Sequence, residues 1–224
     1  GRLSGDWRRE ETMKPYYEQD GIVIYHGDCR EILPTLAPVD LVLTDPPYGV
    51  EIKYDSFEDT PENLDGVILP IIKECIQRFG RVVLTSGNKY AWKYPKPNDV
   101  GVWFNPAGTG FGSWGFCLAH LILYYGKDPY PNKMASSVTG FFGRDGTAPD
   151  HPCPKPLRFM EWLVNRTTLL TDTILDPFMG SGTTLVAAKE LGRQAIGIEI
   201  EERYAEIAAK RLAQGVFDFS SRSL

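Results

Sequence analysis

Asp45, Pro46, Pro47 and Tyr48 form a short turn directly after an apolar run at 40–45 that is typical of a buried strand. Two consecutive prolines remove backbone N–H donors and stiffen the turn. Such a turn presents carbonyl oxygens and the Asp45 carboxylate as acceptors, with Tyr48 as a flat stacking face. An exocyclic amine on a planar ring needs this set, because it has two N–H groups to satisfy. The segment predicts amine chemistry, and a tight turn without a chemical role is the alternative.

A second segment, ILDPFMGSGTT at 174–184, predicts a strand, a glycine-rich turn and a helix. Gly180 and Gly182 let the backbone approach a ligand closely, and the following helix N-terminus favours a carboxylate or phosphate. The segment is neither a Walker P-loop nor a full G-x-G-x-x-G fingerprint. Glu199 ends the next predicted strand, 23 positions beyond Asp176, close to the ~20-residue spacing of a ribose-binding acid. A nucleoside ligand is predicted; for Glu199 a solvated acid at a helix start is the alternative.

Two weaker segments add polar residues at predicted element ends. HGDCREILPTL at 26–36 places Asp28 at a strand end, and HPCPKP at 151–156 precedes a predicted helix. Either segment alone is more often a turn than a site. His151 and Cys153 are close in sequence, but nothing nearby completes a ligand set, so no metal is expected. The four cysteines show no paired spacing, which favours reduced thiols in a cytoplasmic protein.

Apolar strands alternate with amphipathic helices along most of the chain, which predicts an α/β fold with a mostly parallel sheet covered on both faces. No apolar run reaches the ~18 residues of a membrane span, and no signal peptide is expected. The predicted strands lie at 21–26, 40–45, 81–86, 118–126, 173–178 and 194–200, with a further strand at 100–104, and the predicted helices at 61–79, 157–170, 183–191 and 201–214.

The middle of the chain is irregular and locally basic, although the formal net charge is −5. Between Ser86 and Lys133 five lysines stand against two acidic residues, interleaved with aromatic side chains. Phosphate neutralisation needs such lysines, and we expect Lys89, Lys93 and Lys96 to contact nucleic acid. A solvated lysine fringe over aromatic packing is the alternative. Acidic residues crowd instead into 55–65 and 199–206, and they are expected to be solvated.

Taken together, the four segments resemble the S-adenosylmethionine-dependent amino-methyltransferases of DNA. The catalytic tetrapeptide of that family, D/N/S-P-P-Y/F/W, is matched at 45–48, its cofactor loop F-x-G-x-G at 178–182, and its H-P-x-x-K-P segment at 151–156. Asp28 matches the acid that meets the cofactor adenine. The catalytic motif precedes the cofactor loop, which resembles the permuted β subgroup. The resemblance covers roughly 20–212.

The resemblance implies a Rossmann-like methyltransferase fold with a seven-stranded sheet and a small irregular insert. It divides the chain into an N-terminal tail (1–13), a catalytic half (14–88), a variable insert for target recognition that includes a core strand (89–150) and a cofactor-binding half (151–224). The implied catalytic residues are Asp45, Pro46, Pro47 and Tyr48. The implied cofactor-binding residues are Asp28, Cys29, Asp45, Lys155, Asp176, Phe178, Gly180, Ser181, Gly182, Thr183 and Glu199.

The implied substrate is double-stranded DNA, whose target base would be flipped out and stacked on Tyr48. Asp at the first tetrapeptide position favours N6 of adenine, and N4 of cytosine is the alternative. RNA or protein glutamine methylation, or a cofactor-binding subunit without catalysis, are further alternatives. The insert is small for the family, so recognition is expected to be short, relaxed, or dependent on a homodimer partner or a second specificity subunit. A restriction-modification enzyme in the cytoplasm of a bacterium or archaeon, or one encoded by a phage, is expected.

Overall fold

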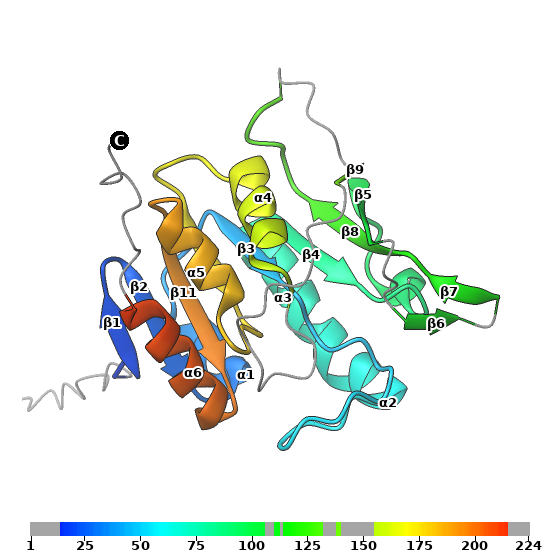
Figure 1. Cartoon of the computed structure of the whole chain (residues 1–224), viewed down its shortest axis with the longest axis horizontal. Helices are drawn as coiled ribbons and strands as arrows, with labels where there is room; N and C mark the ends of the chain where they lie inside the picture. The colour runs from blue at the N-terminus through cyan, green and yellow to red at the C-terminus, as the bar shows by residue number, and fades with distance from the viewer. Residues whose placement is uncertain (1–13, 106–109, 113, 132–137, 140–154, 215–224) are drawn as a thin grey trace, which may run out of the picture.

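The computed structural model describes residues 14–105, 110–112, 114–131, 138–139 and 155–214 (Figure 1). Its main sheet contains nine strands among these residues, and a separate hairpin contains two more. The strands of the main sheet are β1 (Tyr17–Gln19), β2 (Ile22–His26), β3 (Leu41–Thr44), β4 (Val82–Ser86), β5 (Asp99–Phe104), β8 (Ala119–Tyr125), β9 (Val138–Thr139), β10 (Thr173–Asp176) and β11 (Gln194–Glu199), and the hairpin pairs β6 (Gly110–Gly112) with β7 (Gly115–Cys117).

The strand order is β1-β2-β11-β10-β3-β4-β8-β5-β9, and the five strands from β2 to β4 in that order run parallel. Strand β8 is antiparallel to both of its neighbours. The predicted α/β class is confirmed, and both strands expected in the middle of the chain are present as β5 and β8. The main sheet has two strands more than the seven predicted, because the short edge strands β1 and β9 extend it. Asp20 and Gly21, with φ of 52° and 77°, join β1 to β2 in the backbone conformation of a type I′ hairpin.

Helices cover both faces of the sheet, as predicted. The helices are α1 (Cys29–Ile32), α2 (Pro61–Asn63), α3 (Leu69–Phe79), α4 (Leu157–Thr167), α5 (Thr183–Glu190) and α6 (Glu202–Ala213), with the 3-10 turns η1 (Leu33–Thr35) and η3 (Ala91–Lys93) and the π turn η2 (Leu64–Ile68). Figure 1 shows α4, α5 and α6 together on one side of the sheet. In β3, Leu41 and Leu43 pack into the same core cluster as these helices, whereas Val42 packs with α1 and α3. None of the helices within the described ranges is long and apolar enough to cross a membrane.

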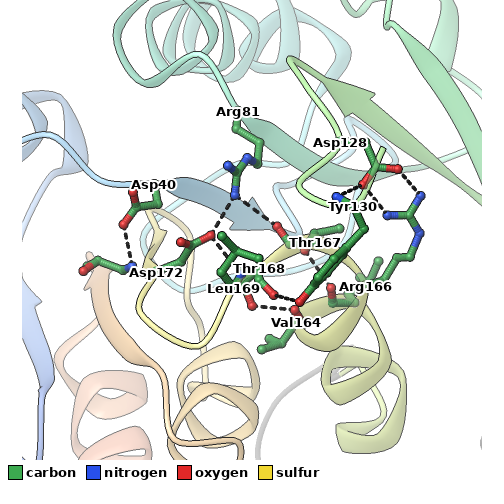
Figure 2. Close-up of polar contacts among 12 residues, drawn as sticks. Asp40, Arg81, Asp128, Tyr130, Val164, Arg166, Thr167, Thr168, Leu169 and Asp172 are labelled. Atoms are coloured by element: carbon green, nitrogen blue, oxygen red, sulfur yellow. Dashed lines mark hydrogen bonds and ion pairs between the residues drawn. The ribbon is translucent and has the colours of Figure 1, made fainter. Parts of the chain in front are cut away.

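Polar contacts close the edge of the sheet at which β4 and β10 begin (Figure 2). The Arg81 guanidinium, just before β4, donates to Asp172, just before β10, at 2.8 Å. Arg166 at the end of α4 forms two hydrogen bonds with Asp128, at 2.9 and 2.7 Å, which tie α4 to the segment after β8. The amino edge of the sheet therefore carries ion pairs that hold the fold together. The carboxyl edge, where parallel α/β sheets bind ligands, lies at the other end of the strands.

Candidate active site

A cavity of about 430 Å³ lies at the carboxyl edge of the parallel strands. Its volume falls within the roughly 300–1,000 Å³ of small-molecule sites. Asp45 follows β3, Asp176 ends β10 and Glu199 ends β11, so the strand order brings three carboxylates from distant parts of the chain to one edge. The predicted residues that line the cavity are Asp28, Cys29, Asp45, Pro46, Pro47, Tyr48, Lys155, Asp176, Phe178, Gly180, Ser181, Thr183 and Glu199.

Asp45 accepts three hydrogen bonds, all from side chains. Its Oδ1 accepts hydrogen bonds from the hydroxyls of Tyr48 and Thr85, and its Oδ2 accepts one from Lys155 Nζ at 2.5 Å. Burial alone would raise the pKa of Asp45, but the positive charge of Lys155 and the three hydrogen bonds hold it below its usual value. The turn therefore carries an ionised acceptor at neutral pH. The sequence had no signal for Thr85, which lies within the neighbouring strand β4.

The Tyr48 ring is buried and packs tightly against the backbone after β4. A Cβ atom at Gly87 would lie 2.9 Å from the ring, so only glycine leaves room for it. Lys155 Nζ lies 5.3 Å from the ring centre, and the His120 ring lies 5.8 Å away at a tilt of 47°. The hydroxyl oxygens of Tyr48 and Thr85 lie 3.1 Å apart. These contacts fix the ring beside the Asp45 carboxylate; stacking on a base stays a prediction.

Asp176 is buried and acts as a junction of the fold. One oxygen accepts from the Thr44 hydroxyl at 2.7 Å and from the Phe178 N–H at 3.1 Å, and the other accepts from the Thr184 hydroxyl at 2.5 Å. Burial raises the pKa of Asp176 to about 6, although these hydrogen bonds lower it. The carboxyl thus joins β3, the glycine-rich turn and α5, besides lining the cavity.

Glu199 holds the glycine-rich turn from the neighbouring strand. It is 8% exposed, and it accepts from the N–H groups of Gly180 at 2.8 Å and Glu201 at 2.9 Å. Burial raises the pKa of Glu199 to about 7. A carboxylate has about four acceptor positions, and these two N–H groups use two of them.

Gly182 is the one predicted cofactor residue that does not line the cavity. It lies at the N-terminus of α5 with φ +77°, and a Cβ atom there would lie 2.7 Å from Ala208 in α6. The glycine is therefore needed for a tight helix-helix approach behind the turn. Gly180 is therefore the glycine that can allow a ligand to approach the backbone closely, whereas Gly182 allows α5 and α6 to pack.

Asp28 and Cys29 form the far wall of the cavity, after β2. Asp28 caps α1 by accepting from the Arg30 N–H at 2.9 Å, and it pairs with the Arg30 guanidinium at 2.5 Å. The hydrogen bonds from Arg30 lower the pKa of Asp28 despite partial burial. Burial raises the pKa of the Cys29 thiol to about 12, so the thiol is neutral.

Two buried acids organise the loop that follows the D-P-P-Y turn, and the sequence analysis missed both. Asp59 is 2% exposed and accepts from three backbone N–H groups, those of Gly49 at 2.6 Å, Val50 at 3.1 Å and Ile52 at 3.2 Å. The expectation that Asp59 is solvated is wrong, because the backbone N–H groups of the loop donate to its buried carboxylate.

Glu201 is the second of these acids. It is 8% exposed, and one oxygen accepts from the Asp55 N–H at 2.9 Å and from the N–H and hydroxyl of Ser56, both at 3.0 Å. Glu201 itself lines the cavity, as does Ser56. The expectation of a solvated acid at the start of α6 is therefore wrong for Glu201, which holds the loop against the cavity.

The predicted DNA-contacting lysines lie outside the cavity lining. Lys89, Lys93 and Lys96 are exposed and follow β4, beside the strand that leads to Asp45. The ammonium groups of Lys89 and Lys93 lie 4.9 and 5.1 Å from the centre of the Tyr90 ring, and Lys93 pairs with Asp65 at 2.6 Å. His151 and Cys153 lie outside the described residues. Within the described residues no group of three or more His, Cys, Asp or Glu side chains could hold a metal ion.

Comparison with solved structures identifies the fold as that of the Rossmann-like methyltransferases. The crystal structure of an M1.HpyAVI–SAM complex superposes with a TM-score of 0.67 at 25% identity, covering 85% of this chain and 98% of that chain. The PvuII DNA methyltransferase (cytosine-N4-specific) gives a TM-score of 0.71 at 18% identity, covering 92% and 91%. The latter likeness concerns the fold alone.

Sequence comparisons show a likeness to DNA methyltransferases. The DNA methylase family model (N6_N4_Mtase) matches residues 102–210. Type II methyltransferase M2.LlaDCHI of Lactococcus lactis subsp. cremoris is 26% identical over 90% of this chain and 93% of its own length. Type II methyltransferase M.HinfI of Haemophilus influenzae is 28% identical over 85% and 68%. The chain is thus similar to the DNA methyltransferases of the N6/N4 family, and these comparisons support S-adenosylmethionine as its cofactor.

Proposed function

We propose that the protein transfers a methyl group from S-adenosylmethionine to the N6 amine of adenine in double-stranded DNA. The ionised Asp45 carboxylate beside the Tyr48 ring carries the proposal, because an exocyclic amine needs an acceptor and a ring face together. The Asp-first tetrapeptide favours adenine over cytosine. N4 of cytosine is the second candidate, since the PvuII enzyme carries out that chemistry on the same fold.

In the proposed reaction the target base leaves the duplex and enters the cavity edge at the D-P-P-Y turn. Asp45 and the Pro46 carbonyl accept the two amine N–H groups, and Tyr48 holds the plane of the base. Accepting both hydrogens turns the nitrogen lone pair towards the methyl donor. The bound cofactor supplies an electrophilic methyl group on a sulfonium. Holding donor and acceptor in line supplies much of the rate enhancement.

The residues around the cavity fit this cofactor. Glu199 keeps acceptor capacity for the ribose hydroxyls, and Asp28 lies after the adjacent strand for the adenine, as the resemblance implies. Phe178 and Phe57 add apolar surface to the lining. Gly180, Ser181 and Thr183 complete the proposed cofactor set at the start of α5. Asp176, bonded to Thr44 and Thr184, is proposed to position the turn.

DNA is proposed to lie across the exposed lysines after β4. Lys89, Lys93 and Lys96 would neutralise phosphates, while the segment 89–150 would recognise the target sequence. The Type II relatives support a place in restriction-modification. A homodimer or a second specificity subunit stays a prediction. Light scattering of the purified protein measures its mass and tests for the homodimer.

Mass spectrometry of digested DNA tests the proposed function. The purified protein is incubated with S-adenosylmethionine and unmethylated genomic DNA of mixed sequence, and the nucleosides are quantified. N6-methyladenine is the expected product, and Asp45→Asn is the control that should make it at least ~100-fold more slowly. N4-methylcytosine alone would refute the adenine assignment. Parallel reactions contain RNA or protein in place of DNA. Methylation of RNA or protein, with no methylation of DNA, would refute the substrate class.

A further inference from the structure

Lys155 is a buried cation at the catalytic turn, with a side chain only 6% exposed. Its ammonium lies 2.5 Å from Asp45 Oδ2 and 5.3 Å from the centre of the Tyr48 ring. The resemblance assigned Lys155 to the cofactor. Its ammonium also contacts Asp45 and the Tyr48 ring, the two groups that bind the target base in the proposed function.

The ammonium and an exocyclic amine are alike as hydrogen-bond donors. Asp45 Oδ1 is engaged by Thr85 and Tyr48, so Oδ2 is the oxygen to which an incoming donor has access. Lys155 already bonds to that oxygen, so a target amine must share it or replace the ammonium there. Lys155 therefore both braces the acceptor and competes for it.

We propose that Lys155 is a positioning residue for methyl transfer, whose ammonium braces the Asp45 carboxylate through Oδ2 and yields that oxygen to the target amine. The proposal rests on the proposed function for the identity of the site, and it holds for adenine and cytosine amines alike. Lys155 acts through Asp45, so its loss changes how Asp45 binds and titrates.

The charges around Asp45 give Lys155 a distinct electrostatic effect. The titratable groups facing Asp45 are Lys155, Tyr48, Tyr94, His120 and Asp176. Burial and the nearby Lys155 charge lower the pKa of His120 to about 4, so His120 is neutral at pH 7. Within the described residues Lys155 is thus the one cation of this set. Without it, burial acts unopposed by a positive charge, and the pKa of Asp45 rises.

Lys155→Met tests the proposal, because methionine keeps most of the unbranched side chain and removes the ammonium and its charge. The acid limb of kcat should move to higher pH by at least about one unit, and activity should recover as the pH is raised. Above that limb the KM for DNA should fall several-fold, because the amine no longer competes with an ammonium. Lys155→Arg, which keeps the charge, should leave the acid limb near its wild-type position.

An activity-free readout accompanies the kinetics. The protein labelled with 13C at aspartate carboxyls is titrated by NMR without cofactor or DNA, and Asp45→Asn assigns the resonance. In Lys155→Met the Asp45 resonance should titrate at higher pH than in the wild type. Lys189→Met is the matched control, because it removes a largely buried lysine that pairs with Asp20 at 3.3 Å, away from the cavity lining.

A purely structural role would lower kcat by one factor at every pH, with the Asp45 titration unmoved, and that result would overturn the proposal. An unchanged or higher KM for DNA would overturn the competition at Oδ2. If Lys155→Met does not fold, Lys155→Gln is measured with the same expectations. A wild-type protein that methylates no DNA would refute the proposed function, while the NMR titration would still decide whether Lys155 controls Asp45.

Discussion

Glu199 makes the stability of this protein depend on pH in a direction opposite to that of most carboxylates. Burial raises its pKa from the ordinary 4.5 to about 7, so the folded chain binds the proton more tightly than the unfolded chain. Below pH 4.5 the group is protonated in both states. The free energy of unfolding therefore falls as the pH rises from about 4.5 to about 7, and it levels off above that.

The size of the effect follows from the two pKa values. The difference between about 7 and 4.5 corresponds to about 3 kcal/mol of unfolding free energy lost across that range. Glu199→Gln removes the titration and keeps the shape. Its amide NH2 must face either the Gly180 or the Glu201 N–H, so the variant also loses one hydrogen bond, worth roughly 1–3 kcal/mol at every pH.

Urea unfolding at pH 5 and pH 8, at equal ionic strength, measures both contributions. At pH 5 the variant should be less stable than the wild type. Between pH 5 and pH 8 the wild type should lose about 2.5 kcal/mol relative to the variant, so that the gap closes or reverses. Asp176, whose pKa is about 6, titrates in both proteins. Glu206→Gln, which removes an exposed carboxylate of α6, is the control. A gap constant within about 0.5 kcal/mol would refute the reasoning, since ordinary surface substitutions change stability by no more than that.

Three further predictions concern other parts of the site. Asp45→Asn should lower kcat at least ~100-fold with an unchanged dissociation constant for the cofactor in calorimetry, and weakened cofactor binding would contradict the assigned role. Glu201→Ala should speed proteolysis of the loop after the D-P-P-Y turn about tenfold or more, because three hydrogen bonds are lost; an unchanged cleavage rate would show that other contacts hold the loop. Replacing Lys89, Lys93 and Lys96 together by Ala should reduce the salt slope of DNA binding by roughly 0.9 per lost phosphate contact, and an unchanged slope would place DNA on another surface.

The parallel core and the position of the site were predictable from the sequence, because both depend on local patterns. Strand β10 ends at Asp176 and β11 at Glu199, within two residues of the predicted strand ends. Since parallel strands end at the same edge, the motifs after them had to meet there. The additional edge strand β1 had a readable signal as well. Asp20-Gly21 between two short runs is a strong hairpin signal.

The roles of the acidic residues were harder to predict, because they depend on contacts between distant segments. Asp59 and Glu201 stand in acidic stretches whose composition indicates solvated surface. Each is buried because a loop turns its backbone N–H groups onto the carboxylate. Lys155 pairs with Asp45 across 110 positions, and its sequence motif indicated a cofactor contact instead. Periodicity and spacing in the sequence cannot predict these pairings, because each depends on how a loop folds.

Asp45, Asp176 and Glu199 occupy equivalent places at the ends of neighbouring parallel strands, yet their pKa values move in different directions. Asp176 and Glu199 are buried and Asp45 is partly buried, and burial alone would raise each pKa. Asp176 and Glu199 bond to neutral hydroxyl and N–H donors, which do not offset burial, and their pKa values stay raised. Asp45 alone among the three bonds to a cation, and its pKa is lowered. The strand end thus determines where a carboxylate lies, whereas the charge of its partner determines whether it is an ionised acceptor at neutral pH. Lys155 makes that difference at Asp45, which is why its removal should move the catalytic pH profile while leaving the sheet and the glycine-rich turn intact.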